Sequence, residues 1–154
     1  MEIIKADKSH KKYVLTLLDD FRTACNAIID PKKKYVSTTA KDNGGSTFDS
    51  VINSPSSAIF LAKEGNDYIG IVTIYKIPQI RKGEYCGEIE EMYVNQKYQG
   101  KGVAQLLIDA VIDWAKKEGM SNIRLESSIE LKRAHRFYEK AGFSLHTRGY
   151  EKKI

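Results

Sequence analysis

Residues 95–119 read NQKYQGKGVAQLLIDAVIDWAKKEG, and they join a glycine-containing loop to a strongly periodic apolar segment. Apolar side chains recur there at steps of three and four, which places them on one face of an α-helix. They are Val103, Leu106, Leu107, Ala110, Val111, Trp114 and Ala115. Gly119 stands where a left-handed C-terminal cap would end such a helix. The stretch therefore predicts a long helix that packs one face on a core.

Two glycines, Gly100 and Gly102, directly precede this helix. The first N–H groups of a helix lack partners within it, and its dipole adds roughly half a positive charge at that end. Glycines there let a phosphate approach the backbone, although a tight turn with positive φ explains them equally well. A Walker A loop is excluded because no Ser or Thr follows Lys101. A dinucleotide fingerprint is excluded because its third glycine is replaced by Gln105.

The composition is that of an ordinary folded protein. The chain of 154 residues is 42% hydrophobic and 29% charged, and we expect residues 1–154 to form a single domain. No apolar run approaches the ~20 residues of a membrane span, and the first residues have no apolar signal-peptide core, so we expect a cytoplasmic protein with no membrane partner. Two cysteines and three scattered histidines give no metal-site spacing. The net charge of +5 is too diffuse for nucleic-acid binding but suits an anionic cofactor.

Strand and helix patterns alternate along the rest of the chain. Residues 30–47 are rich in Lys, Thr, Gly and Asn, and we expect a loop there with part of a helix after it. The order indicates one mixed sheet with helices, in the α/β or α+β class. Strands are expected at 2–6, 57–65, 67–77, 83–95 and 122–128 with one or two more in 144–154, and further helices at 10–25 and 131–143.

The order of elements and two motifs together resemble the GNAT N-acetyltransferase superfamily. The family signature, Gln or Arg followed by two residues, Gly, one residue, and Gly or Ala, is fully matched by residues 99–104. A second stretch, AHRFYEKAGF at residues 134–143, is similar to the family's A-x-x-x-Y-E-x-x-G-F ending. The resemblance covers nearly the whole chain. It implies a mixed, mostly antiparallel central sheet with helices on both faces and strands splayed at the acyl-CoA site.

The resemblance also implies where acetyl-coenzyme A binds, without a metal. Backbone N–H groups of the glycine loop would hold its pyrophosphate, and the strand before the loop would pair its backbone with the pantetheine arm beside a bulge. Many family members have a coenzyme-contacting Asn where this chain has Leu131, so that contact is either lost or supplied by Ser127, Ser128 or the main chain. The implied binding residues are Met92, Tyr93, Val94, Gln99, Gly100, Lys101, Gly102, Val103, Ala104 and Gln105.

Acetyl transfer to an amine needs a proton acceptor for the amine and benefits from a proton donor to the leaving thiolate. By resemblance, Tyr138 is the general acid, with its hydroxyl directed at the coenzyme sulfur. Its spacing alone also fits a tyrosine packed on an amphipathic helix.

The proton acceptor is less clear from the sequence. The strand at 83–95 carries Glu88, Glu90 and Glu91, although acids are uncommon in strands. Strand alternation predicts Glu88 and Glu90 on the face of Met92, with Glu91 on the other face. We predict Glu90 as the first candidate base and Glu126, on the following strand, as the second. These acids can instead simply bind a cationic amine.

The predicted function is an acetyl-CoA-dependent N-acetyltransferase that moves an acetyl group to a primary amine by direct attack in a ternary complex. The alternative is a non-catalytic acyl-CoA-binding module of the same fold. The acceptor, a small molecule or a protein amine, cannot be read from the sequence, although residues 26–57 should wall its side of the site. Homodimers are common in the family, and the sequence does not decide the oligomeric state.

Overall fold

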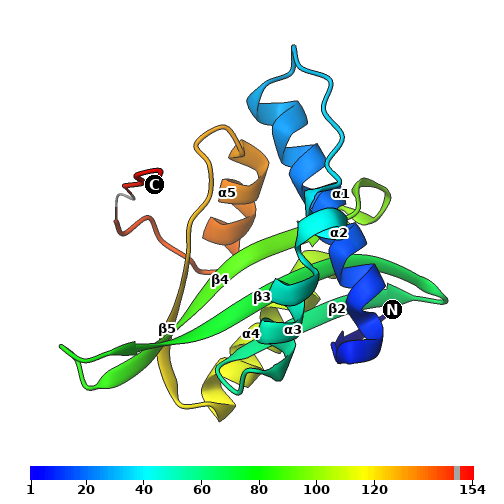
Figure 1. Ribbon diagram of the computed structural model, residues 1–154. Coiled ribbons are helices and arrows are strands. Elements are labelled where there is room, and N and C mark those ends of the chain that lie inside the picture. The colour runs from blue at the N-terminus through cyan, green and yellow to red at the C-terminus, as the bar shows by residue number, and fades with distance from the viewer. Residues whose placement is uncertain (148–149) are drawn as a thin grey trace.

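The computed structural model of the chain describes residues 1–147 and 150–154 and contains one five-stranded sheet, in the order β1-β2-β3-β4-β5 (Figure 1). Neighbouring strands are antiparallel from β1 to β4, whereas β5 runs parallel to β4. The mixed, mostly antiparallel sheet is therefore confirmed. The strands are β1 (Glu2–Lys5), β2 (Ser57–Glu64), β3 (Asp67–Gln79), β4 (Glu84–Val94) and β5 (Met120–Leu125).

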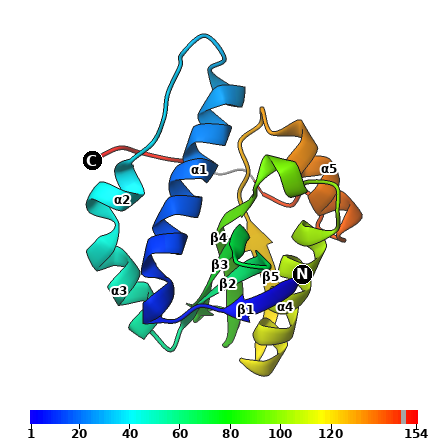
Figure 2. The same cartoon turned by 90° about the vertical axis from the view of Figure 1, so that its right-hand side faces the viewer.

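Helices cover both faces of the sheet, as Figure 2 shows edge-on. One face carries α1 (Lys11–Ile29), α2 (Thr39–Asn43) and α3 (Gly45–Asn53), and the other carries α4 (Val103–Lys117). The last helix, α5 (Lys132–Lys140), follows β5, and two short 3-10 helices are η1 (Lys8–His10) and η2 (Gln96–Tyr98). Within the described ranges, no helix combines the length and hydropathy needed to cross a bilayer.

The core is divided by the sheet into two apolar clusters. Because successive strand residues point to opposite faces, Ile71 packs with the α1 cluster and Val72 with the α4 cluster. The predicted apolar face of α4 is largely confirmed, except that Leu106 is 42% exposed. Ile108 lies on the buried stripe in its place and is 0% exposed.

A buried carboxylate ties α1 to the start of α2 and to the residue Ser37 before it. Asp19 is 2% exposed, and its oxygens accept hydrogen bonds from the Ser37 hydroxyl (2.9 Å) and from the backbone N–H groups of Ala40 (2.9 Å) and Lys41 (3.1 Å). Desolvation raises the pKa of Asp19, but these hydrogen bonds outweigh it and leave the pKa below its usual value. The ionised Asp19 thus fixes residues 37–41 against α1.

Three sequence expectations need correction. The first helix continues to Ile29, beyond the predicted end at residue 25. The strand predicted at 122–128 is β5, which ends at Leu125, because β5 separates from β4 there. No strand lies among the described residues of 144–154, where Leu145 and Tyr150 remain 98% and 95% exposed; residues 148–149 of that predicted segment lie outside the described residues.

Candidate active site

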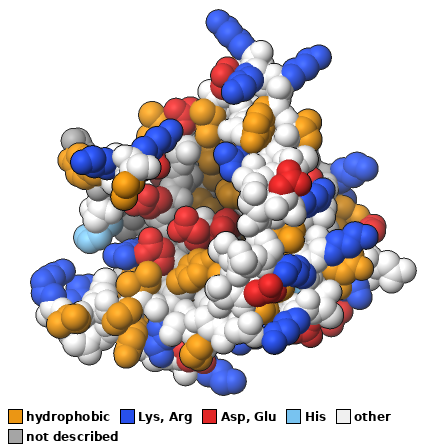
Figure 3. All heavy atoms as spheres, in the orientation of Figure 1, with side chains coloured by type: hydrophobic (Ala, Val, Ile, Leu, Met, Phe, Trp, Pro, Cys, Tyr) orange, Lys and Arg blue, Asp and Glu red, His pale blue; other side chains and the backbone are white. Residues whose placement is uncertain are grey.

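A cavity of about 1470 Å³ lies where β4 and β5 separate. Its walls come from α1 and α3 on one side and α5 on the other, with the second half of β4 between them. The space-filling view shows this hollow with acidic side chains around it (Figure 3). The cavity collects most of the residues that the sequence predicts for the site.

The opening follows from the register of the sheet. The β4–β5 ladder runs from Tyr85↔Met120 to Ile89↔Leu125 and goes no further. Beyond Ile89, β4 remains paired with β3 as far as Val94 but has no described partner on its β5 side. This is the splay that the resemblance implies. It leaves the backbone of residues 92–94 with a free edge that an extended ligand can pair with.

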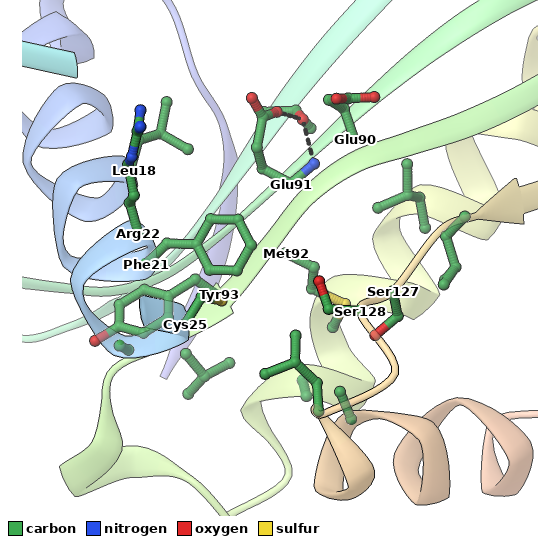
Figure 4. A pocket seen from close by; sticks show the side chains of 18 of the residues that line it. Leu18, Phe21, Arg22, Cys25, Glu90, Glu91, Met92, Tyr93, Ser127 and Ser128 are labelled. Atoms are coloured by element: carbon green, nitrogen blue, oxygen red, sulfur yellow. Dashed lines mark hydrogen bonds between the residues drawn. The ribbon is translucent and has the colours of Figure 1, made fainter. Parts of the chain in front are cut away.

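A bulge in β4 changes the direction of its acidic side chains. The register against β3 shifts by one residue, so that Thr73 faces both Glu90 and Glu91. Ile89 and Met92, three residues apart, consequently pack into the same core cluster. The predicted alternation is therefore wrong here, and Glu90 and Glu91 lie side by side rather than on opposite faces (Figure 4).

Of this pair, Glu91 is the more firmly held. The Thr73 hydroxyl donates to Glu91 Oε2 and also accepts a hydrogen bond from the Glu91 backbone N–H, at 3.0 Å. Burial raises the pKa of Glu91, the hydrogen bond from Thr73 lowers it, and the nearby charge of Glu90 raises it, with a net upward shift. Glu90 also lines the cavity but is exposed.

The other two acids have different surroundings. Glu88 Oε2 accepts hydrogen bonds from Arg124 Nε (2.9 Å) and Nη2 (2.6 Å), directly across the β4–β5 ladder and outside the cavity lining. Glu126 lines the cavity from the loop after β5, not from the strand itself, and is exposed. Glu88 therefore has a structural partner, whereas Glu126 faces the open end of the splay.

Tyr138 reaches the cavity from α5, opposite α1. Its ring packs edge-on against Phe137 and Phe143, with centroids 5.5 and 5.9 Å apart. Burial, together with the nearby Cys25 of α1, raises the pKa of Tyr138 to about 12. The phenol is therefore protonated at neutral pH and able to donate a hydrogen bond or a proton.

Both glycines of the predicted phosphate loop have left-handed backbone conformations. Gly100 has φ 79° and Gly102, the N-cap residue of α4, has φ 84°. A Cβ added at Gly102 would meet nothing within 4 Å, so backbone conformation, not crowding, requires glycine there. The loop is tied to the end of β4 by a hydrogen bond from Gln99 Nε2 to the Val94 carbonyl, at 2.9 Å. The glycines thus serve a tight turn with positive φ, and at Gly102 they also leave the backbone open to a ligand.

The predicted loop residues do not all face the cavity. Gln99, Gly100, Gly102, Ala104 and Gln105 line it, while Lys101 and Val103 do not. The Lys101 ammonium lies 5.2 Å from the centre of the Tyr98 ring, and the Val103 side chain is buried in the core. The Gln105 side chain donates to Asp109 (2.9 Å).

The first turn of α5 contributes a cation that the sequence interpretation did not include. Arg133 lines the cavity, and its Nη2 lies 3.9 Å from the place of a Cβ on Gly100. The basic residues in LKRAHRF were the available signal, but only the docking of α5 places them beside the glycine loop. Leu131, Ser127 and Ser128 also line this wall.

Comparison with known proteins agrees with this geometry. Residues 19–143 match the family model described as Acetyltransferase (GNAT) family. The chain belongs to this family. One GNAT relative is the uncharacterised N-acetyltransferase YhdJ of Bacillus subtilis (strain 168), 34% identical over 76 residues, a match that covers 49% of this chain and 53% of YhdJ. The chain thus spans about half the length of this relative.

Two solved structures share the GNAT fold over the full chain. A transcriptional regulator from Bacillus halodurans C-125 superposes with a TM-score of 0.82 at 19% identity, covering 99% of both chains. Ribosomal-protein-alanine N-acetyltransferase from Brucella melitensis biovar Abortus 2308 gives 0.76 at 18% identity, covering 100% of both. At these identities the likeness establishes the fold alone, and the predicted fold is confirmed.

Proposed function

We propose that this GNAT protein is an acetyl-CoA-dependent N-acetyltransferase that moves an acetyl group to a primary amine by direct attack in a ternary complex. The observation that carries the proposal is the composition of one cavity. The family's glycine loop, the free edge of β4, the protonated phenol of Tyr138 and the partly buried carboxylate of Glu91 all line it. Together these groups supply a binding surface, a proton donor and a proton acceptor.

Two parts of the cavity suit two parts of one acetyl-CoA molecule, the pyrophosphate and the pantetheine arm. The backbone of residues 99–105 at the start of α4, with its left-handed glycines and open space, suits the pyrophosphate, and Arg133 adds a positive charge beside it. Lys101 and Val103 would contribute only main-chain groups. The backbone edge of Met92, Tyr93 and Val94 that faces away from β3 suits the amide-containing pantetheine arm. When bound there, acetyl-CoA supplies the activated acetyl group.

The proton transfers are assigned to the chain's own side chains. An alkylamine with a pKa near that of Lys, about 10.4, is almost wholly protonated at neutral pH and must lose a proton before or during attack. Glu91 is our first choice for accepting it, ahead of Glu90 and Glu126, because Glu91 is the most buried of the three and is held by Thr73. Tyr138 is assigned to donate a proton to the departing sulfur.

Acetyl-CoA is expected to stabilise the folded chain, because a ligand that binds only the folded state raises the free energy of unfolding. The gain is about 2.7 kcal/mol at a hundredfold excess over the dissociation constant. Thermal unfolding with increasing acetyl-CoA measures it, and ATP at the same concentration controls for unspecific anion binding. An unchanged Tm under saturating acetyl-CoA would count against the whole proposal.

Gly102→Ala is expected to weaken acetyl-CoA binding by about tenfold or more, equivalent to ~1.4 kcal/mol. The new Cβ would enter the open space in front of the loop and strain a backbone at φ 84°. Gly119→Ala is the matched control, since Gly119 has φ 71°, an equally open Cβ position and no place in the cavity lining. Both variants should lose similar stability, roughly 1–2 kcal/mol. Equal acetyl-CoA affinity in the two variants would remove the phosphate-loop assignment.

A further inference from the structure

The β4 bulge places two adjacent carboxylates, Glu90 and Glu91, in the cavity, but only Glu91 is hydrogen-bonded to Thr73. We propose that Thr73 is a positioning residue that makes Glu91, not Glu90, the proton acceptor; this inference rests on the proposed acetyl transfer. Thr73 lies on β3, between β2 and β4, and is 2% exposed. The Thr73 side chain is therefore held between the strands of the sheet, not in a loop.

One hydroxyl group serves both the backbone and the side chain of Glu91. A bulge leaves a residue outside the regular ladder, and here the Glu91 N–H donates to Thr73 Oγ1 at 3.0 Å. The hydroxyl has a single proton, which it donates to Glu91 Oε2. Figure 4 marks a hydrogen bond at Glu91 with a dashed line. The second carboxylate oxygen, Oε1, is then left for a proton from the acceptor amine.

The neighbouring Glu90 side chain is not fixed in this way. Among the described residues, its side chain takes part in no hydrogen bond or ion pair, and it is exposed, whereas Glu91 is partly buried. A carboxylate that is already oriented loses less rotational freedom when the substrate binds, and it starts closer to a reactive geometry. The fixed partner therefore favours Glu91 over its neighbour, although both line one cavity.

The pH dependence of this arrangement has a definite sign. The cavity that Glu91 lines also holds charged and titratable groups from its other walls: Asp19, Arg22 and Cys25 on α1, Tyr75 on β3, Glu90 and Tyr93 on β4, Tyr98 in η2, Glu126 and Glu130 in the loop after β5, and Lys132, Arg133, Arg136, Tyr138 and Lys140 on α5. Burial raises the pKa of Glu91, Thr73 lowers it and Glu90 raises it. Removal of the Thr73 hydroxyl should therefore raise this pKa further. Since the base must be ionised, the acid limb of the rate profile should move to higher pH.

Thr73→Val and Thr73→Ser in the full chain test the proposal. Val keeps the branched shape without the hydroxyl, whereas Ser keeps the hydroxyl. With acetyl-CoA and an active amine, we expect Thr73→Val to lower kcat by at least about tenfold and to shift the acid limb of kcat/KM upward. Thr73→Ser should restore both values to near those of the unsubstituted chain. Ser57→Ala controls for a lost buried hydroxyl, because Ser57 is 7% exposed, donates to the Val51 carbonyl at 2.7 Å and does not line the cavity.

A second measurement separates this inference from the proposed function. Carbon-13 NMR titration of the glutamate carboxyls needs no turnover, and it should show the pKa of Glu91 rising in Thr73→Val and returning in Thr73→Ser. An unchanged Glu91 pKa in Thr73→Val would overturn the role of Thr73, whatever the activity. An acid limb that is unmoved in Thr73→Val but abolished in Glu90→Gln would also overturn it, while leaving acetyl transfer intact. Failure of every amine to react would instead remove the proposed function.

Discussion

Tyr138→Phe is expected to lower kcat by on the order of 10² to 10⁴ while changing the Kd for acetyl-CoA by less than about twofold. The substitution removes only the hydroxyl, so the edge-on packing against Phe137 and Phe143 is retained. Because the pKa of Tyr138 is raised to about 12, the phenol remains a proton donor throughout the neutral range. Single-turnover rates and acetyl-CoA titrations separate the two effects.

The matched control for this substitution is Tyr85→Phe. Tyr85 lies at the other end of β4 and outside the cavity lining, so the Tyr85→Phe variant should keep the kcat of the unsubstituted chain. An unaltered rate in Tyr138→Phe would mean that the thiolate leaves unaided or takes its proton from water. A large loss of acetyl-CoA affinity would instead give Tyr138 a binding role.

Glu91→Gln is expected to cut kcat at pH 7 by on the order of 10² to 10⁴, more than either Glu90→Gln or Glu126→Gln. Gln keeps the shape but cannot accept the proton. The loss should shrink as pH rises, because more of the amine is then neutral. Rates from pH 6 to 9 at saturating acceptor compare the three variants, and a pure binding role would appear as a raised KM for cationic acceptors.

Glu88→Gln is the control on the same strand, because Glu88 faces Arg124 and lies outside the cavity lining. It should keep its pH profile even if it loses some stability. A larger defect in Glu90→Gln would return the base to the residue that the sequence favours. A larger defect in Glu126→Gln would move it across the splay, and three silent variants would leave the proton to bulk water.

Local patterns in the sequence were sufficient to predict the long helix, the glycine loop before it and one residue of the cavity. The apolar spacing from Val103 to Ala115 predicted α4, and the glycine loop before it has the left-handed turns that its glycines allow. The AHRFYEKAGF motif led to Tyr138, which the structure places in the cavity. Such features depend on neighbours within a few residues, or on a motif whose spacing is fixed within the family.

Long-range geometry explains what the sequence did not predict. Simple alternation separated Glu90 from Glu91, whereas a bulge opposite Thr73, a residue on another strand, brings them together. Arg133 gains its place beside Gly100 only through the docking of α5. The end of β5 at Leu125 likewise coincides with the last pair of its ladder with β4, Ile89↔Leu125, and β4 is distant in the sequence.

The most direct test of N-acetyltransferase activity is a screen of primary amines that detects the thiol of coenzyme A released from acetyl-CoA. The panel should span protein N-termini, lysine side chains, polyamines, amino acids and aminoglycosides, with reactions lacking the amine as blanks. We expect amine-dependent thiol release with at least one class, matched by an equal amount of N-acetylated product and strongly reduced in Tyr138→Phe. Saturable acetyl-CoA binding with no thiol release for any amine would contradict an enzymatic role and would indicate a non-catalytic acyl-CoA-binding module.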